Sequence, residues 1–421
     1  MKKRSHISIL SAVLVASVAL TGCAGGNSSA GGNNASGGSS STPPAQTQPS
    51  TSGSSGGTAA PANGGVIKIA TQTPLSGNQS SLGDAIKTGA EYALNKRKEE
   101  FKALGFDIQL FPQDDQADPK IGVSNAEMLI SDPDVYGVVG HLNSGVAIPS
   151  SVKYEEGKLV MVSPANTAVK LTEEGKKTVH RICARDDAQG PKAAMYAKNT
   201  LGVKTAFIIH DKTAYGQGLG DQVKMQFEKD GVQMLGYEGI TQGEKDYSAV
   251  LNQVTAKNPD IIFFGGLYPE GGILVKQARE KGYKGYFMGG DGLDSSDMIK
   301  IAGPAVEGVV FTSVAGDVTQ TEEGKKWADE YKKTTNKPLE TYSVYGYDSM
   351  NVILNGVLEA IKANGGNKPT REQVLDSVHK TKDFQGQFTK VTFDDKGDNT
   401  NADVFIYKYD KDKSNFVGKA Q

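Results

Sequence analysis

Small polar residues follow apolar segments in the first half of the sequence, whereas aromatic and acidic residues follow them in the second half. Ser144 and Thr167 each come shortly after a short apolar segment, and Tyr215, Tyr268 and Asp291 do so further along the chain. Hydroxyls and free backbone N–H groups suit a carboxylate, whereas an aromatic ring with a carboxylate suits an ammonium group. Two such sets facing each other predict a site for a zwitterion.

These polar residues must be positioned by a sheet, because ligands of open α/β sheets bind beyond the carboxyl ends of the strands. From residue 66 onward, short β-branched segments alternate with amphipathic ones, which predicts right-handed βαβ units and parallel sheets. The fold class is therefore α/β, with two doubly wound parallel-sheet lobes. We expect strands over 66–70, 106–111, 135–139 and 159–162 in one series, and over 205–209, 232–237, 261–264 and 286–288 in the other.

The segments between these strands have helical periodicity. Helices are expected over 84–101, 120–130 and 146–156, and then up to 201, from 218, from 247 and up to 281. Segments 323–333 and 347–363 also look helical, and 404–409 has strand character. Periodicity alone leaves open which of the two sheets these C-terminal segments complete.

The N-terminal residues predict secretion and a lipid anchor. Residues 1–22 combine a basic start with the apolar segment 7–20, which is typical of a signal peptide. Leu20-Thr21-Gly22-Cys23 resembles the bacterial lipobox, which implies cleavage before Cys23 and lipidation of its sulfur. A plain signal peptide with an incidental cysteine is the alternative.

Residues 24–64 contain only Ala, Gly, Asn, Ser, Thr, Pro and Gln. Such a composition has no side chain large enough to build a core, so 23–64 is expected to be a disordered Gly/Ser/Pro tether. A spacer that crosses cell-wall material would have the same composition.

Composition excludes several classes of protein. A chain of 421 residues with 37% hydrophobic and 22% charged residues is too polar for a polytopic membrane protein. With 46 Lys and Arg against 48 Asp and Glu, the formal charge of −2 gives no broad basic surface for nucleic acid. Two cysteines supply neither a disulfide framework nor a structural zinc site.

Motifs of catalysis and cofactor binding are missing, so we predict no enzyme activity, no cofactor and no metal. Ser150-Ser151-Val152-Lys153 and Lys87-Thr88-Gly89 match two motifs of penicillin-binding enzymes, but in the wrong order. The phosphate-binding loop, the dinucleotide fingerprint and His-Glu-x-x-His are absent from the sequence, and its histidines are scattered singly.

Several ordered motifs carry a resemblance to a known family. They are the stretch 140–167, Ile208-Ile209-His210-Asp211-Lys212 with Tyr215-Gly216, Gly265-Gly266, Tyr268-Pro269-Glu270 and Met288-Gly289-Gly290-Asp291-Gly292. Together they resemble the type I periplasmic-binding-protein family, and within it the branched-chain amino-acid (Leu/Ile/Val) binding lipoproteins of ABC transporters. The resemblance covers essentially all of 66–421.

The resemblance implies a clamp of two lobes joined by a three-segment hinge. The first lobe would contain 65–185 with about 316–395, and the second 186–315 with about 396–421. Such a protein captures an amino acid outside the cytoplasm and delivers it to the ABC permease subunits of an importer. We expect a monomer, held at the bacterial cell membrane by its lipid.

The resemblance also implies ligand-binding residues. In the first lobe, the hydroxyls of Ser144 and Thr167 would hold the ligand carboxylate, aided by backbone N–H groups near Leu142 and Asn166. In the second lobe, Tyr215 and Asp291 would contact the ligand, with Asp291 taking the ammonium group, and Tyr268 is a further candidate. Asp291→Ala is expected to abolish binding and to leave the thermal transition of the ligand-free protein nearly unchanged.

Departures from the family pattern change the expected pocket wall. Leu82 and Leu267 stand where familiar members carry aromatic residues, and the family's first-lobe disulfide is missing, since its positions read Ala117 and Asn143. Cys183 is expected to be a buried apolar thiol. The ligand could therefore be another small amino acid or amide, and a ligand-sensing receptor coupled to a signalling partner is an alternative function.

Overall fold

The computed structural model describes residues 64–421, and its first sheet contains five parallel strands. Their spatial order is β2-β1-β3-β4-β5, with β1 Gly65–Thr73, β2 Phe106–Asp114, β3 Val135–Gly140, β4 Val160–Ser163 and β5 Val179–Arg181. The expected signal peptide 1–22, Cys23 and the tether 23–64, except its last residue, lie outside the described residues.

The second sheet contains seven strands in the order β14-β13-β10-β9-β8-β6-β7. They are β6 Thr205–His210, β7 Gln233–Gly239, β8 Ile261–Gly265, β9 Tyr286–Gly289, β10 Val310–Ser313, β13 Phe405–Tyr409 and β14 Ser414–Lys419. The α/β class is confirmed, but this sheet is not wholly parallel. β13 runs antiparallel to β10 and forms a hairpin with β14, and a hairpin needs only a short turn rather than a crossover helix.

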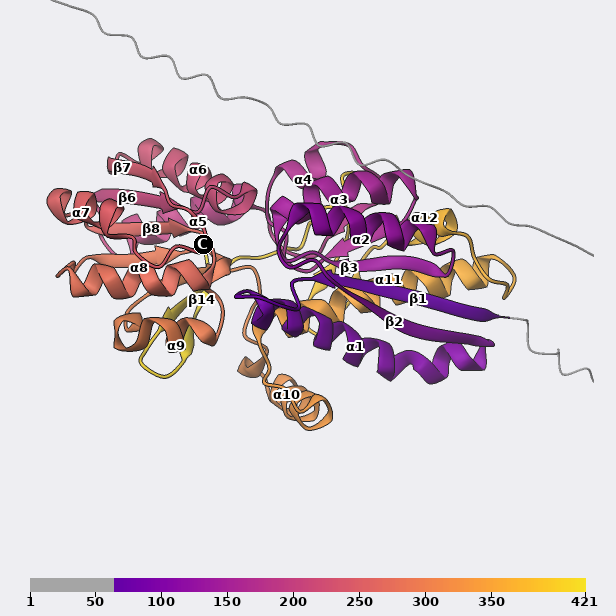
Figure 1. Cartoon of the computed structure of the whole chain (residues 1–421). Coiled ribbons are helices and arrows are strands. Elements are labelled where there is room, and N and C mark those ends of the chain that lie inside the picture. The colour runs from indigo at the N-terminus through magenta and orange to yellow at the C-terminus, as the bar shows by residue number, and fades with distance from the viewer. Residues whose placement is uncertain (1–63) are drawn as a thin grey trace, which may run out of the picture. The chain divides into compact units, whose positions relative to one another are not determined.

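Two sets of helices cover both faces of the first sheet (Figure 1). α1 (Ser80–Ala103) packs against α11 (Thr341–Ala363), while α2 (Pro119–Ser131) packs against α3 (Ser144–Glu156). Because side chains alternate along a strand, Ile69 of β1 joins the core with α1 and α11, and Ala70 joins the core with α2 and α3. The short α4 (Lys170–Glu173), α10 (Glu322–Thr335) and α12 (Arg371–His379) belong to the same group.

The helices of the second group are α5 Asp186–Asn199, α6 Ala214–Lys229, α7 Ser248–Lys257, α8 Tyr268–Glu280 and α9 Asp297–Ala302. α6 begins before the expected residue 218 because the Thr213 side chain accepts a hydrogen bond from the N–H of Gly216 and caps the helix. Three 3₁₀ turns (Asp291–Leu293, Gly303–Val306 and Val318–Gln320) and a two-stranded ribbon, β11 Phe384–Gln385 and β12 Lys390–Val391, complete the elements described.

The chain passes between the two sheets three times. It leaves the first sheet after β5, returns to it after β10, and leaves it again before β13. This order answers the question that periodicity left open, because α11 packs on the first sheet and β13 extends the second. Within residues 64–421, no helix is both long and apolar enough to span a membrane.

Candidate ligand-binding site

The first turn of α3 presents unpaired hydrogen-bond donors. β3 is fully buried and leads into this helix, whose N-cap residue is Asn143. Among the described residues, the backbone N–H groups of Ser144 and Gly145 donate to no protein acceptor. The start of a helix attracts anions, because its free N–H groups and the helix dipole both favour negative charge. This turn therefore suits a carboxylate, with the Ser144 hydroxyl as a further donor.

The side chain of Asn166 fixes the loop after β4. Its Oδ1 accepts from the backbone N–H of His141 at 3.0 Å and from the Ser163 hydroxyl at 2.8 Å. Its Nδ2 donates to the carbonyl of Leu142 at 2.9 Å. Asn166 thus joins this loop to the one that precedes α3. The hydroxyl of the next residue, Thr167, is buried and has no hydrogen-bond partner in the part of the chain that the structure describes.

Asp291 follows β9 and is held by three side chains. Its Oδ1 accepts from Gln189 Nε2 at 2.9 Å and from the Tyr215 hydroxyl at 2.8 Å, and its Oδ2 accepts from the Tyr342 hydroxyl at 2.6 Å. Burial raises the pKa of this carboxyl above its ordinary value, although the three hydrogen bonds act in the opposite direction. A cation placed next to Asp291 would favour its charged form.

A cavity of about 280 Å³ is shared by the first turn of α3 and Asp291. Drug-sized ligands occupy cavities of about 300–1,000 Å³, so this one suits a small molecule. Its lining contains no Lys, Arg or His. The lining residues are Ala117, Pro119, Leu142, Asn143, Ser144, Gly145, Val146 and Ala165 from the first group of elements, Thr213, Ala214, Tyr215, Gln242, Leu267 and Asp291 from the second, and Tyr342 from α11.

The structure brings four of the seven predicted ligand-binding residues together in this cavity: Leu142, Ser144, Tyr215 and Asp291. Asn166 and Thr167 lie behind it in the loop after β4 and do not line it. Tyr268 lies apart, because its hydroxyl contacts the Ser81 hydroxyl and the carbonyl of Asn78 at the start of α1.

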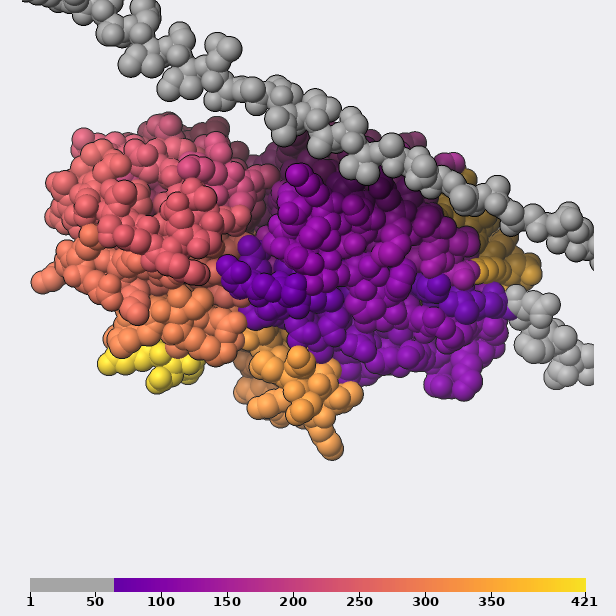
Figure 2. Space-filling model, in the orientation of Figure 1, coloured from indigo at the N-terminus to yellow at the C-terminus, as the bar shows by residue number. Residues whose placement is uncertain are grey.

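That contact joins the two groups of elements, since Tyr268 begins α8. Figure 2 shows the indigo N-terminal segment of the described chain against the second group on this face.

Six polar residues at or near the site were not among those predicted from the sequence: Asn143, Asp186, Gln189, Thr213, Gln242 and Tyr342. Tyr342 stands far from the other site residues in sequence, in a helix that could not be assigned to a sheet, so no local signal indicated it. Gln189 and Asp186 lie at the start of α5, directly after the first passage between the sheets. The available signal was a polar residue directly after a passage between the sheets, because the ligand-binding cavity lies next to these passages.

Arg181 holds the loop after β4 in place through hydrogen bonds to its backbone. Its side chain is fully buried, and Nη1 donates to the carbonyls of Asn166 and Ala168, both at 2.9 Å. The N–H of Thr167 belongs to the same trans peptide as the Asn166 carbonyl and therefore points away from Arg181. Nε of Arg181 donates to Asp398, which lies in the third passage between the sheets.

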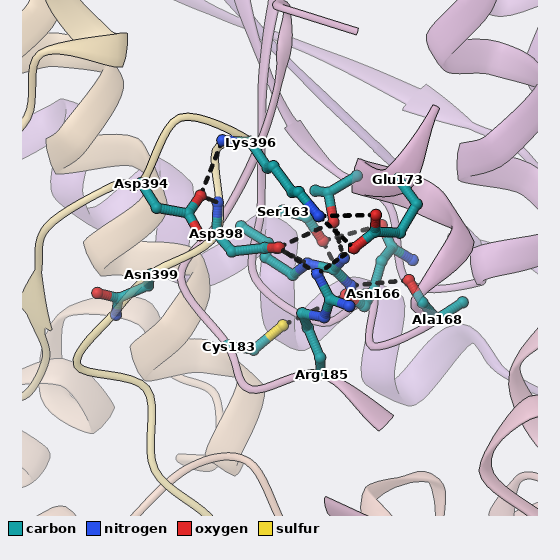
Figure 3. Close-up of polar contacts among 12 residues, drawn as sticks. Ser163, Asn166, Ala168, Glu173, Cys183, Arg185, Asp394, Lys396, Asp398 and Asn399 are labelled. Atoms are coloured by element: carbon teal, nitrogen blue, oxygen red, sulfur yellow. Dashed lines mark hydrogen bonds and ion pairs between the residues drawn. The ribbon is translucent and has the colours of Figure 1, made fainter. Parts of the chain in front are cut away.

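Asp398 is the centre of a wider ion-pair network (Figure 3). Its Oδ2 accepts from Arg185 at 2.7 Å, and Arg185 also pairs with Glu173, which in turn pairs with Lys396. Burial acts to raise the pKa of Asp398, but the charge of Arg181 and the hydrogen bond from Arg185 outweigh it and hold the pKa below its ordinary value. Two of the three passages are thereby tied to the loop after β4.

Cys183 is buried, with its Sγ 3.5 Å from the carbonyl oxygen of Asn166. Burial raises the pKa of this thiol, which disfavours the reactive thiolate. Among the described residues, no group of three or more His, Cys, Asp and Glu side chains is placed to hold a metal ion.

Comparison with known sequences gives a consistent result. A family model described as periplasmic binding protein matches residues 66–414. A protein of Brucella abortus called Leu/Ile/Val-binding protein homolog 2 is 33% identical over 345 residues, which cover 82% of this chain and 91% of that protein. An amino acid binding protein of Pseudomonas aeruginosa is 34% identical over 346 residues, which cover 82% and 90%.

Solved structures have the same fold. The leucine binding protein LivK of Thermotoga maritima matches with a TM-score of 0.77 and 28% identity, over 84% of this chain and 99% of that one. LivJ of Streptococcus pneumoniae, a branched-chain amino acid transporter substrate binding protein in complex with isoleucine, matches with a TM-score of 0.75 and 23% identity, over the same shares. The family match, the identities and the fold agree, and the chain belongs to the periplasmic binding protein family.

Proposed function

We propose that this chain is an extracytoplasmic solute-binding lipoprotein that captures an aliphatic amino acid, above all a branched-chain one, and delivers it unaltered to an ABC importer. The observation that carries the proposal is the cavity shared by Ser144 and Asp291. Ser144 and Gly145 offer N–H and hydroxyl donors to a carboxylate, whereas Asp291 offers an acceptor to an ammonium group. An α-amino acid satisfies both ends with charge-assisted hydrogen bonds.

The remaining lining favours an aliphatic side chain. Leu142, Val146 and Leu267 contribute apolar surface, and Ala165 and Pro119 contribute small apolar groups. A ligand with an acidic side chain would find no Lys, Arg or His in this lining. Burying a charge without a partner costs several kcal/mol, so an aspartate or glutamate ligand would be rejected.

The relatives support the same ligand class. The Brucella abortus protein is called a Leu/Ile/Val-binding protein homolog, and the Thermotoga maritima protein is called a leucine binding protein. Both are more than 25% identical to this chain over four fifths of its length. We therefore expect leucine, isoleucine or valine to be the ligand bound most tightly.

Binding would use the two sheets as lobes that close on the ligand. The first lobe would be 65–185 with about 316–395, and the second 186–315 with about 396–421. Ligand contacts in both lobes would shift the population from open to closed, since a ligand favours the state to which it binds better. The permease would then recognise the closed monomer. In this cycle the protein binds and releases, and it catalyses no reaction.

The N-terminal residues would keep this binding unit at the membrane. Removal of 1–22 would expose Cys23 for lipidation, and 23–64 would connect the anchor to the folded part. Mass spectrometry of the chain purified from bacterial membranes should find a lipid on Cys23, and Cys23→Ala should release the protein from the membrane fraction.

Isothermal titration of the full chain with each of the standard amino acids tests the ligand assignment. We expect leucine, isoleucine and valine to bind most tightly, and Ser144→Ala to weaken that binding by about tenfold or more, the value of one hydrogen bond to a charged group. Ser151→Ala is the matched control, because Ser151 lies in the same helix and its hydroxyl donates to Ile148. Tightest binding of an acidic amino acid, or of none, would contradict the proposal.

A further inference from the structure

His141 and Asp115 form a buried pair next to the ligand-binding cavity. Both side chains are fully buried, and Nδ1 of His141 lies 3.1 Å from Oδ2 of Asp115. Neither residue lines the cavity that contains Ser144 and Asp291. Burying two ionisable groups costs free energy even when they are paired, so the pair calls for a role beyond stability.

The pair joins two loops that the sheet keeps apart. Asp115 directly follows β2 and His141 directly follows β3, and β1 lies between these two strands. Oδ1 of Asp115 also accepts from the N–H of Ala117 at 3.0 Å, and Ala117 lines the cavity. The N–H of His141 donates to Asn166 Oδ1 at 3.0 Å. Two separate parts of the cavity wall are thereby connected across the end of β1.

The second ring nitrogen of His141 extends this connection into the helices. Nε2 lies 3.1 Å from the Tyr154 hydroxyl, which donates to Gln72 Oε1 at 2.6 Å. Nε2 of Gln72 donates in turn to the carbonyl of Gly122 at 2.8 Å. Tyr154 belongs to α3 and Gly122 to α2, so both ring nitrogens of His141 are fixed. The loop that begins at His141 cannot shift without breaking these contacts.

That loop leads into the turn with the free donors for a carboxylate. The N–H groups of Ser144 and Gly145 donate to no described acceptor. The side chain of Asn143, the N-cap residue, accepts no hydrogen bond from its own helix, and its Nδ2 donates to Gln79. The turn is therefore not held by its own cap, and His141 supplies a support from beneath the loop. Donors already held in the bound geometry bind a ligand more tightly.

We propose that His141 is a positioning residue for the ligand's carboxylate: together with Asp115 it holds the loop so that the N–H groups of Ser144 and Gly145 face the cavity. His141 does not touch the ligand itself. This inference rests on the proposed function and adds to it the residue that orders the carboxylate donors before the ligand arrives.

The first test is titration of the full chain and its His141→Phe variant with L-leucine. Phenylalanine keeps an aromatic ring and removes both ring nitrogens. Leucine should bind about tenfold more weakly to this variant, because the donors of the turn would be ordered only on binding. His379→Phe is the matched control, since His379 ends α12 and does not line the cavity. It should bind leucine as the unaltered chain does.

A double-mutant cycle separates positioning from a general loss of stability. Ser144→Ala should cost at least about threefold less affinity in the His141→Phe background than in the unaltered chain, because a displaced turn no longer presents the Ser144 hydroxyl. Tyr215→Phe changes a cavity residue of the second group and should cost the same factor in both backgrounds. Equal costs of Ser144→Ala in both backgrounds would overturn the inference, whether or not His141→Phe lowers the unfolding midpoint.

Asp115 tests the same contact from the other side. Asp115→Asn offers an amide N–H to Nδ1 of His141 and keeps an oxygen for the N–H of Ala117, so leucine affinity should stay within about threefold of the unaltered chain. Asp115→Ala keeps neither contact and should lose about tenfold. The cycle with Ser144→Ala applies to Asp115→Ala in the same way, so these variants carry the test if His141→Phe does not fold.

The outcomes distinguish this inference from the proposed function. Unaltered leucine affinity in both His141→Phe and Asp115→Ala would overturn the role of His141 and leave the proposed function standing. If the unaltered chain bound no amino acid, the proposed function itself would fail.

Discussion

The buried guanidinium of Arg181 and the carboxylate of Asp398 form an ion pair between residues 217 positions apart in the chain. Arg181 ends β5, just before the first passage between the sheets, and Asp398 lies in the third passage. The same guanidinium holds two carbonyls of the loop after β4. One side chain thereby links the site to two of the three connections.

Asp398→Asn should be strongly destabilising, because it leaves the Arg181 charge buried without its partner. Loss of one member of a buried pair costs about 3–5 kcal/mol of unfolding free energy, which urea denaturation would measure. Lys396→Gln is the control, since the Lys396–Glu173 pair in the same network is largely exposed and exposed pairs contribute about 0–1 kcal/mol. Equal costs for the two variants would refute the central role of Asp398.

Asp291→Ala should abolish leucine binding and also lower stability. The sequence predicted a nearly unchanged thermal transition, but the structure shows that Gln189, Tyr215 and Tyr342 all donate to Asp291. Each buried donor left without an acceptor costs about 1–3 kcal/mol, so we expect a loss of about 2 kcal/mol or more in urea. Asp291→Asn keeps an acceptor oxygen and should be the more stable of the two variants. An unchanged urea midpoint in Asp291→Ala would show that the three hydrogen bonds to Asp291 do not stabilise the fold.

The stability of the ligand-free protein should fall as the pH rises from 6.5 to 8.5. Burial raises the pKa of Asp186 to about 8 and that of Asp294 to about 7, whereas both carboxyls titrate near pH 4 when unfolded. In this window the native state therefore binds more protons than the unfolded state, and the unfolding free energy decreases with pH.

Burial lowers the pKa of His180 to about 3 and also lowers the pKa of His210. Both histidines act in the opposite direction, but only in the lower part of this pH window, because an unfolded histidine titrates near pH 6.5. The unfolding free energies measured by urea titration at pH 6.5 and 8.5 should differ by about 1–3 kcal/mol. Each pH unit over which a group is protonated only in the native state contributes about 1.4 kcal/mol. Asp186→Asn should remove the larger part of the difference. A protein that is more stable at pH 8.5 would show that these carboxyls are charged in the native state.

Tyr268→Phe should weaken leucine binding without affecting the fold. The Tyr268 hydroxyl joins α8 to the start of α1 through Asn78 and Ser81, and a contact of this kind stabilises a closed arrangement. Loss of about 0.5–1.5 kcal/mol corresponds to a two- to tenfold lower affinity. Tyr283→Phe is the control, because the Tyr283 hydroxyl donates to the backbone carbonyls of Pro259 and Tyr286, and all three residues belong to the second group of elements. Equal affinities for the two variants would exclude such a role.

The succession of most strands along the chain was predictable because these strands are short, buried, β-branched segments followed by amphipathic helices. β10 was not predicted, although all four of its residues are buried. β3 and β8 are buried at every position, and the pattern located both. β5 was missed because it has only three residues, two of which are the polar His180 and Arg181. β14 was missed because it is a half-exposed edge strand with little apolar content.

The site was predictable in part for the same reason. Ser144 and Asp291 follow buried strands directly, and both line the cavity. Tyr342 lines the cavity from the start of α11, and Asp186 lies near it at the start of α5, so only the tertiary arrangement brings them there. The position of Tyr268 differs from the prediction because α8 turns its first residue toward α1 rather than into the cavity.

Because the backbone passes between the sheets three times, cleavage of one connection by a protease should not separate the two sheets. A single cut in any one connection would leave the other two connections between the sheets intact. A cut in the third connection would also leave the C-terminal hairpin paired with β10 within the second sheet. Cleaved molecules should therefore migrate as fragments in denaturing gels while remaining one particle in solution.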